Sequence, residues 1–167
     1  VGVVPGILVG ILLSLIRLIH SFSRPYDAML CEVSGRGGFH DVGEAAENGA
    51  FCTLPGLIVY RFYASLVFAN ANYFVERLRS LVENHPDVRW LVIDAQAMVE
   101  IDVTAADQLL AFHKELRERK IHLRFARGNR PLRESLARFG VVAALGDDHF
   151  HAHLDQAIDD FRGGGGG

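Results

Sequence analysis

The chain has 167 residues, of which half are apolar and 22% are charged, and its formal net charge is −3 at pH 7. This composition is typical of a globular protein and excludes a disordered chain, while the lack of net positive charge argues against nucleic acid as a partner. The two cysteines, Cys31 and Cys52, have no ligand-spaced partner, so we expect reduced thiols in a cytosolic compartment. The length predicts one domain plus an appendage.

The first 16 residues form an uncharged apolar run that stops at Arg17. A bilayer span needs about 20 apolar residues, so the run is slightly short by itself. A secretory signal peptide would carry positive charge before its apolar core, whereas Arg17, His20 and Arg24 follow this one. Positive charge favours the cytoplasmic side. We therefore predict the end of a last membrane span over residues 1–22, with lipid around residues 1–16. A buried core helix is the alternative.

A break in the helix is expected at Pro25, which disfavours the α conformation of the residue before it. We interpret residues 23–27 as a linker. Ala28 to Val33 predicts a short strand, and Ser34 to Thr53, rich in Gly, Asp, Glu and Asn, predicts a loop. The glycines at 35–38 fit neither a Walker A loop nor a dinucleotide fingerprint, so a plain connection is expected there.

The next two elements are a strand and a long helix. Leu57 to Phe62 alternates as a half-buried strand would. Asn70 or Asn72 can cap the helix that follows, and Asn84-His85-Pro86 should end it. The apolar stripe of this helix is Phe74, Leu78, Leu81 and Val82.

Strands and helices continue to alternate in the second half of the chain. Leu91 to Ile93 predicts a central strand covered on both faces. A helical stripe, an alternating strand, a short helix closed by Gly140 at its C′ position and a last helix follow. Their marker residues are Ala105, Leu109, Phe112 and Leu116; Ile121, Leu123 and Phe125; Leu132, Leu136 and Phe139; Leu154, Ile158 and Phe161. This order predicts an α/β fold, a mixed β-sheet with helices packed against it.

Residues 54–74 carry the most informative motif, Leu-Pro-Gly-Leu-Ile-Val-Tyr-Arg-Phe followed by Leu-Val-Phe-Ala-Asn-Ala-Asn-Tyr-Phe. The motif closely resembles the opening of the STAS domain of SulP-type anion permeases, and the resemblance extends from Val1 to Phe161. It implies a STAS-domain fold over residues 28–162, preceded by a partial transmembrane helix. Gly163–Gly167 is expected to be a flexible tail.

The resemblance also singles out residues between the central strand and the next helix. The family pattern is a strand ending in an acid, here Asp94, and then Ile-Asp-x-[ST], here Ile101 to Thr104. In the related anti-sigma factor antagonists, a serine at the position of Thr104 accepts phosphate. The resemblance therefore makes Thr104 and Asp102 regulatory candidates, and Asp94 and Thr104 candidate contacts for an anion or nucleotide. Ala105 replaces a glycine that often follows, which counts against a kinase switch.

A simpler interpretation of Thr104 needs no ligand. Thr104 and Asp107 have the Ser/Thr-x-x-acid spacing of a helix N-terminus, so Thr104 is expected to cap its own helix. The same helix N-terminus would also accept an anion, because its N–H groups are unpaired and it carries partial positive charge. Asp102 would oppose that anion unless it were protonated or turned away.

Three alternating histidines, His149, His151 and His153, would share one face of a strand, as a transition-metal site requires. No cysteine accompanies them and neighbouring aspartates make the stretch polar, so a solvated loop without metal is expected. No nucleophile–base–acid set is readable. We therefore expect no catalytic residues, no cofactor and no enzymatic activity.

The resemblance implies the cytoplasmic regulatory or assembly domain of a SulP-type secondary transporter of sulfate or a related inorganic anion, in a bacterial inner membrane. Expected partners are the membrane domain of the same permease, cytoplasmic proteins and a second copy in a homodimer. We interpret the sequence as a fragment, with the anion-binding residues in other spans. One alternative is a free-standing signalling protein like the anti-sigma factor antagonists, against which the run at 1–16 argues. The other is a nucleotide-sensing STAS module.

Overall fold

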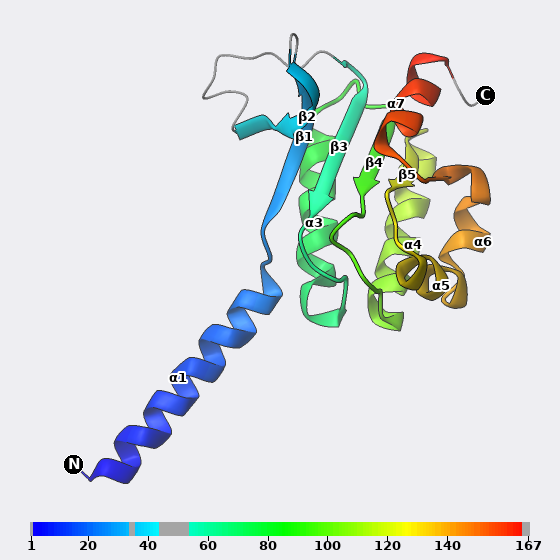
Figure 1. Ribbon diagram of the computed structural model, residues 1–167. Coiled ribbons are helices and arrows are strands. Elements are labelled where there is room, and N and C mark those ends of the chain that lie inside the picture. The colour runs from blue at the N-terminus through cyan, green and yellow to red at the C-terminus, as the bar shows by residue number, and fades with distance from the viewer. Residues whose placement is uncertain (1, 34–35, 44–53, 165–167) are drawn as a thin grey trace.

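A mixed β-sheet organises the chain in a computed structural model, which describes residues 2–33, 36–43 and 54–164 (Figure 1). The strands, in chain order, are β1 (Asp27–Val33), β2 (Arg36–Asp41), β3 (Leu57–Phe62), β4 (Trp90–Asp94), β5 (His122–Ala126) and β6 (Phe150–His151). The helices are α1 (Val3–Ser23), α3 (Phe68–Asn84), α4 (Val103–Glu118), α5 (Arg130–Arg138), α6 (Val141–Leu145), the 3₁₀ turn η1 (Asp147–His149) and α7 (Leu154–Arg162).

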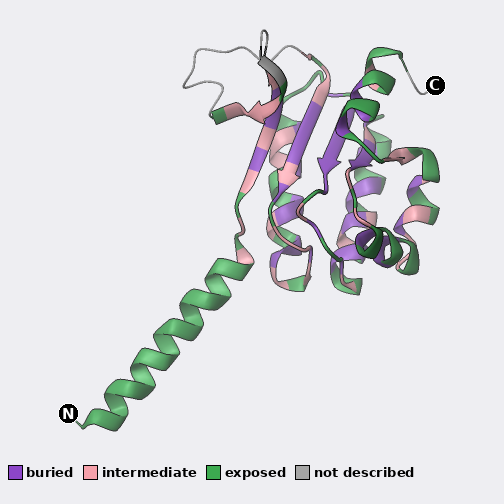
Figure 2. Cartoon of the chain, viewed as in Figure 1, coloured by how far each residue is buried: buried purple, intermediate pink, exposed green. Residues whose placement is uncertain are grey.

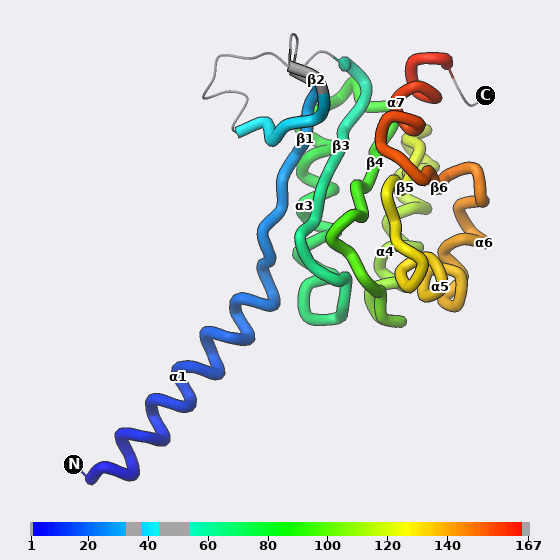
Figure 3. The backbone as a smooth tube through the Cα atoms, in the orientation of Figure 1, coloured from blue at the N-terminus to red at the C-terminus, as the bar shows by residue number. Residues whose placement is uncertain are grey.

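The described strands lie in the order β2-β1-β3-β4-β5-β6. β1 is antiparallel to both neighbours, whereas β3, β4, β5 and β6 are mutually parallel. The predicted mixed sheet is thus confirmed. Because β1 runs against β3, the chain enters β1 from α1 at the end of the sheet where the parallel strands finish (Figures 1 and 3). We call this the carboxyl end of the sheet, and the other the amino end.

Helices cover both faces of the sheet, which explains the continuous burial of β4. On one face, α3, α4, α5 and α6 pack their apolar stripes on residues such as Tyr60 and Leu123, and on the other α7 packs on Val59 and Val92. The predicted helical stripes are confirmed, with Phe74, Leu78, Val82, Ala105, Leu109, Phe112 and Leu116 at most 2% exposed.

Helix α1 stands apart from this core and has no buried residue (Figure 2). It ends at Ser23, as predicted from Pro25, and is long and apolar enough to cross a membrane by length and composition. A buried core helix, the alternative interpretation, is therefore wrong for the described part of this run. Pro5 is tolerated because it lies in the first turn, where N–H groups have no intrahelical acceptor.

Two predictions about the strands are wrong. Part of the predicted loop Ser34–Thr53 is strand β2, which pairs with β1 through contacts such as Cys31 opposite His40. Pairing with β1 satisfies the backbone hydrogen-bonding groups of β2, although its glycine-rich sequence has no alternating pattern that predicts a strand. Residues 34–35 and 44–53 lie outside the described part. Strand β3 is not half-buried, because it is an inner strand with helices over both faces.

The sequence-based predictions for the start of α3 and for the histidine stretch at 149–153 are also wrong. Neither Asn70 nor Asn72 is the residue before α3, which is Val67; instead, the Asn70 side-chain oxygen accepts the Val67 N–H at 2.9 Å from within the first turn. The predicted solvated loop at His149, His151 and His153 contains η1 and β6, which pairs with β5. The histidine side chains of η1 and β6 are only 16% and 8% exposed. Strand β6 has two residues, too few for a readable alternation.

Candidate functional site

Asp102 lies at the carboxyl end of the sheet and caps two helices at once. One carboxylate oxygen accepts the Ala105 N–H at 2.8 Å and so caps α4, while the other accepts the Phe68 N–H of α3 at 2.7 Å. A backbone bridge between Leu66 and Ile101 holds the two loops together. An internal carboxylate thus takes the position that a bound anion takes at a helix N-terminus.

Thr104 is the second residue of α4, not its N-cap, so the predicted capping role is wrong. The N-cap must have extended backbone, and the bridge at Ile101 gives that conformation to Asp102. Thr104 is exposed, and within the described residues its hydroxyl has no hydrogen-bond partner. Its side chain is therefore open to solvent beside the capped end of the helix.

Asp94, at the end of β4, is fully buried between Arg61 of β3 and Arg127, which directly follows β5. Its carboxylate accepts from Arg61 Nε at 2.6 Å, from Arg127 Nε at 2.9 Å, and again from Arg127 Nη2. None of its hydrogen bonds goes to Asp102 or Thr104, so the sequence-predicted residues share one end of the sheet without forming one cluster. Two guanidinium groups against one carboxylate leave a local excess of positive charge. The arginines, 19% and 28% exposed, carry that charge toward solvent.

Sequence reasoning missed both arginines. Arg61 stands in the 54–74 motif, at a strand position whose neighbours are apolar, which is a signal for a buried charge partner. Arg127 gives a weaker signal, because only the parallel pairing of β4 with β5 brings it to Asp94. Its backbone is left-handed, with φ +58°, a conformation that non-glycine residues seldom adopt.

The same end of the sheet carries a patch of exposed large apolar side chains. We call it the apolar edge: Tyr26, Tyr63, Phe68, Val99 and Val103, which are between 44% and 72% exposed. All other exposed large apolar side chains of the described residues belong to α1. The Tyr26 and Tyr63 rings pack at 5.1 Å, and the Val99 N–H donates to the Ser65 hydroxyl in the loop before Phe68, so the segments that carry these side chains lie close together.

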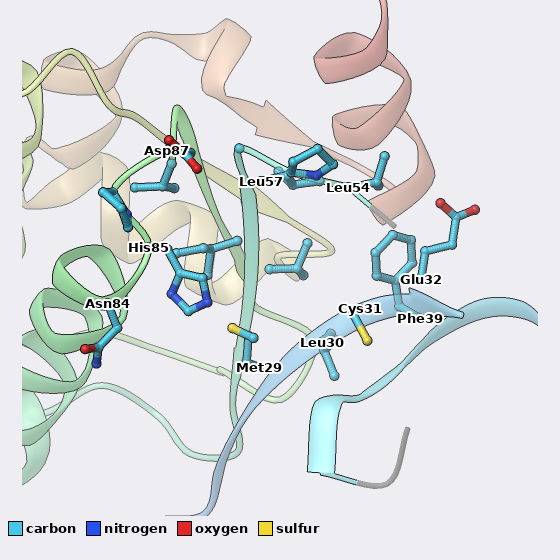
Figure 4. Close-up of a pocket in the computed structure, with 16 residues that line it drawn as sticks. Met29, Leu30, Cys31, Glu32, Phe39, Leu54, Leu57, Asn84, His85 and Asp87 are labelled. Carbon is cyan, nitrogen blue, oxygen red and sulfur yellow. The ribbon is translucent and has the colours of Figure 1, made fainter. Parts of the chain in front are cut away.

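A pocket of about 550 Å³ lies toward the amino end of the sheet, between the β1–β2 hairpin, β3 and the end of α3 (Figure 4). Met29, Cys31 and Phe39 give it an apolar floor, and His85 and Asp87 line its opposite wall. Asp94, Asp102 and Thr104 do not line it. This pocket is therefore not the site that the sequence predicted.

Comparison with known proteins gives a family and a set of relatives. The STAS domain family model matches residues 51–157. The chain is 37% identical over 162 residues to a "Probable sulfate transporter" of Mycobacterium tuberculosis, an alignment that covers 96% of the chain but 28% of the transporter. The chain thus spans about a quarter of the length of this curated relative.

Solved structures share the fold. The murine Slc26a9 anion transporter in the inward-facing state superposes with a TM-score of 0.81 at 13% identity, over 95% of this chain and 25% of that one. The anti-sigma factor antagonist SpoIIAA in its unphosphorylated form gives a TM-score of 0.55 at 14% identity, over 68% of this chain and 94% of that one. The STAS fold predicted from the motif is confirmed.

Proposed function

Because the chain belongs to the STAS domain family, we propose that it is the regulatory or assembly domain of a SulP-type secondary transporter of sulfate or a related inorganic anion. The observation that carries this proposal is an exposed apolar helix, α1, that leads directly into the first strand of a STAS fold. A soluble signalling protein has no need of such a helix, whereas a permease domain must be joined to a membrane domain.

The relatives support the same assignment. The 37%-identical relative is described as a sulfate transporter, and the alignment includes nearly all of this chain. The murine transporter covers 95% of the chain, so its fold must include part of the 21 residues of α1. The anti-sigma factor antagonist covers only 68% of the chain. An anti-sigma factor antagonist-like function therefore has less support. We propose no enzymatic activity, because the family model is that of a STAS domain and the 37%-identical relative is a transporter by its description.

Under this proposal, residues 1–22 are the end of the last membrane span, residues 23–27 a linker, and residues 28–162 a cytoplasmic domain at a bacterial inner membrane. Arg17, His20 and Arg24 follow the apolar run, and positive charge favours the cytoplasmic side. The tail expected at residues 163–167 lies outside the described residues from residue 165 on.

The apolar edge is the surface that suits the membrane domain of the same permease. It lies at the carboxyl end of the sheet, where α1 joins β1, and therefore faces the direction in which the membrane helix leaves the domain (Figure 1). Exposed aromatic and aliphatic side chains gathered at one end of a domain are typical of a surface that another protein covers. Arg61 and Arg127 add positive charge beside it.

Thr104 and Asp102 are the proposed regulatory point of this surface. Thr104 directly follows Val103 of the apolar edge and exposes a hydroxyl at the start of α4. A phosphate on Thr104 would lie beside the Asp102 carboxylate, so it would change the charge of the docking surface and weaken the Asp102 caps. Binding of an anion or nucleotide at Asp94 and Thr104 has less support, because a ligand at Thr104 would meet the same Asp102 carboxylate and Asp94 is fully buried against Arg61 and Arg127.

Sulfate uptake by the complete permease tests the proposal. Phe68→Asp and Val103→Asp introduce charge on the apolar edge without removing a buried contact. An acid in the first turn of a helix suits its dipole, which offsets the repulsion between a single added carboxylate and Asp102. We expect each variant to fold and to reduce uptake about threefold or more. Docking would remove water from the introduced carboxylate, and this cost would weaken the contact with the membrane domain. The matched control is Ala143→Asp, an exposed position on α6.

Uptake that is equal in Phe68→Asp, Val103→Asp and Ala143→Asp would exclude the apolar edge as a docking surface. A second measurement tests the placement of the domain. A cysteine at exposed Lys114 should react with a membrane-impermeant thiol reagent only in inside-out vesicles. Labelling from the outside of intact cells would overturn the cytoplasmic assignment.

A further inference from the structure

A second cavity, of about 600 Å³, lies at the amino end of the sheet, where α4 ends and β5 begins. Helix α6 and the turn η1 close its other side. Its polar lining consists of His113, Arg117, Lys120, His122 and His149, and three apolar residues complete it. No carboxylate lines this cavity, which we call the basic pocket.

Two of its histidines have ring nitrogens without a partner. His113 is only 7% exposed, and its Nδ1 is buried with no hydrogen-bond partner among the described residues. The Nδ1 of His149 is in the same state, and the His149 ring packs edge-on against His122 at 6.4 Å. A buried polar atom left unpaired is costly, so such atoms in a folded protein call for a reason.

The positive groups of the pocket are also unpaired. Arg117 and Lys120 are exposed, and neither forms an ion pair within the described part of the chain. Lys120 has φ +58°, so its ammonium group is presented from a backbone conformation that glycine would adopt with less strain. An acid lies beside the pocket: the Asp148 Oδ2 is 3.7 Å from His149 Nε2, but this carboxylate is 77% exposed and outside the lining.

Burial favours the neutral form of two pocket histidines, so the positive charge of the pocket comes from Arg117 and Lys120. Burial lowers the pKa of His113 and of His149, with smaller contributions from Arg117 and Arg124 respectively, while a backbone contact with Ala144 opposes the shift at His113. A neutral imidazole has one N–H donor and one acceptor nitrogen, so it can still donate to a ligand oxygen. The pocket therefore offers two fixed positive charges and imidazole donors.

We infer that the basic pocket binds a small phosphorylated molecule carrying at least two negative charges. Arg117 and Lys120 would hold its phosphate oxygens, and His113, His122 and His149 would donate to the oxygens that enter deepest. A cavity of about 600 Å³ is in the range of small-molecule sites and exceeds the size of a single inorganic oxyanion. This site is at the opposite end of the sheet from the apolar edge, and it does not depend on the proposed docking.

Calorimetric titration of the complete chain in detergent micelles with inorganic pyrophosphate tests the inference. We expect saturable binding that weakens with added salt. Arg117→Gln and Lys120→Gly should each lower the affinity about tenfold, the value of one charge-assisted hydrogen bond. Lys120→Gly should keep the fold, because glycine suits the left-handed backbone at this position.

The matched control is Arg119→Gln, which removes the same charge from an exposed residue between the two but outside the lining. It should change the affinity less than about twofold. Histidine ring protons give a second measurement, since those of His113 and His149 should shift with pyrophosphate and that of His85 should not. Absence of saturable binding up to about 10 mM pyrophosphate, or an equal loss in Arg119→Gln, would overturn the inference.

Discussion

The two ends of β5 place a basic residue in the same unusual backbone conformation with opposite outcomes. Lys120, before the strand, and Arg127, after it, both have φ +58°. Arg127 uses this conformation to reach the buried Asp94 with two nitrogens, so the strain is offset within the protein. Lys120 has no acidic partner in the described structure and lines the basic pocket.

The comparison extends to the whole sheet. At the carboxyl end, buried charges are paired and the helix N-termini are capped by Asp102, which leaves an apolar surface for another protein. In the basic pocket at the amino end, the Nδ1 atoms of His113 and His149 and the charges of Arg117 and Lys120 lack partners among the described residues. An end with paired polar groups and exposed apolar side chains is suited to docking another protein. An end with unpaired basic groups around a cavity is suited to binding a small anionic molecule.

The largest effect is expected for Asp94→Asn, which removes the carboxylate between Arg61 and Arg127. Breaking a buried ion pair leaves uncompensated charge, so unfolding free energy should fall by about 3 kcal/mol or more. Chemical denaturation measures this loss. Asp107→Asn, at an exposed position on α4, should change stability by less than about 0.5 kcal/mol. A loss below about 1 kcal/mol in Asp94→Asn would mean that the carboxyl end is not held by this cluster.

Glycine at the two left-handed positions should give opposite signs. Arg127→Gly relieves strain but removes the two hydrogen bonds to Asp94, so a net loss of about 2 kcal/mol is expected. Lys120→Gly only relieves strain, so a gain of about 0.5–1 kcal/mol is expected. Thermal melts of both variants provide the measurement. If both variants lost stability alike, Lys120 would have an internal partner and the contrast between the two ends would be wrong.

Asp102→Ala removes the caps of both α3 and α4. Each cap contributes about 1 kcal/mol, so a total loss near 2 kcal/mol is expected by denaturation. Thr104→Ala, two residues away and exposed, should cost less than about 0.5 kcal/mol. The reverse order, with Thr104→Ala the more damaging, would restore Thr104 as the cap.

The smallest and most gradual effect is expected from pH. Burial lowers the pKa of His113 and of His149, so below the ordinary value of about 6.5 the unfolded chain binds protons that the folded chain does not. Stability should be fully present above that pH and decrease as the pH falls to 5.5.

Melting temperatures across this pH range, in a non-phosphate buffer, measure the effect. His149→Gln should flatten the decrease, while His153→Gln, at an exposed position, should leave it unchanged. A melting temperature that rises on acidification would contradict the burial of unpaired imidazoles at the amino end.

Local sequence determined the elements whose signal repeats along the chain. The stripes of α3 and α4, the end of α1 before Pro25, and Gly140 after α5 with φ +78° all follow from spacing or from one residue's conformational limits. The motif at 54–74 determined the family because it combines many such positions. These signals act over a few residues, so no tertiary contact is needed to read them.

Tertiary structure alone decided which polar groups meet. Arg61 and Arg127 each stand 33 residues from Asp94, and only the parallel pairing of β3, β4 and β5 brings their side chains together. Asp102 and Thr104 are both suitable caps by residue type. The bridge from Leu66 fixed the backbone at Ile101 and so selected Asp102. The basic pocket likewise joins the end of α4 to η1, because packing brings together segments that local pattern leaves independent.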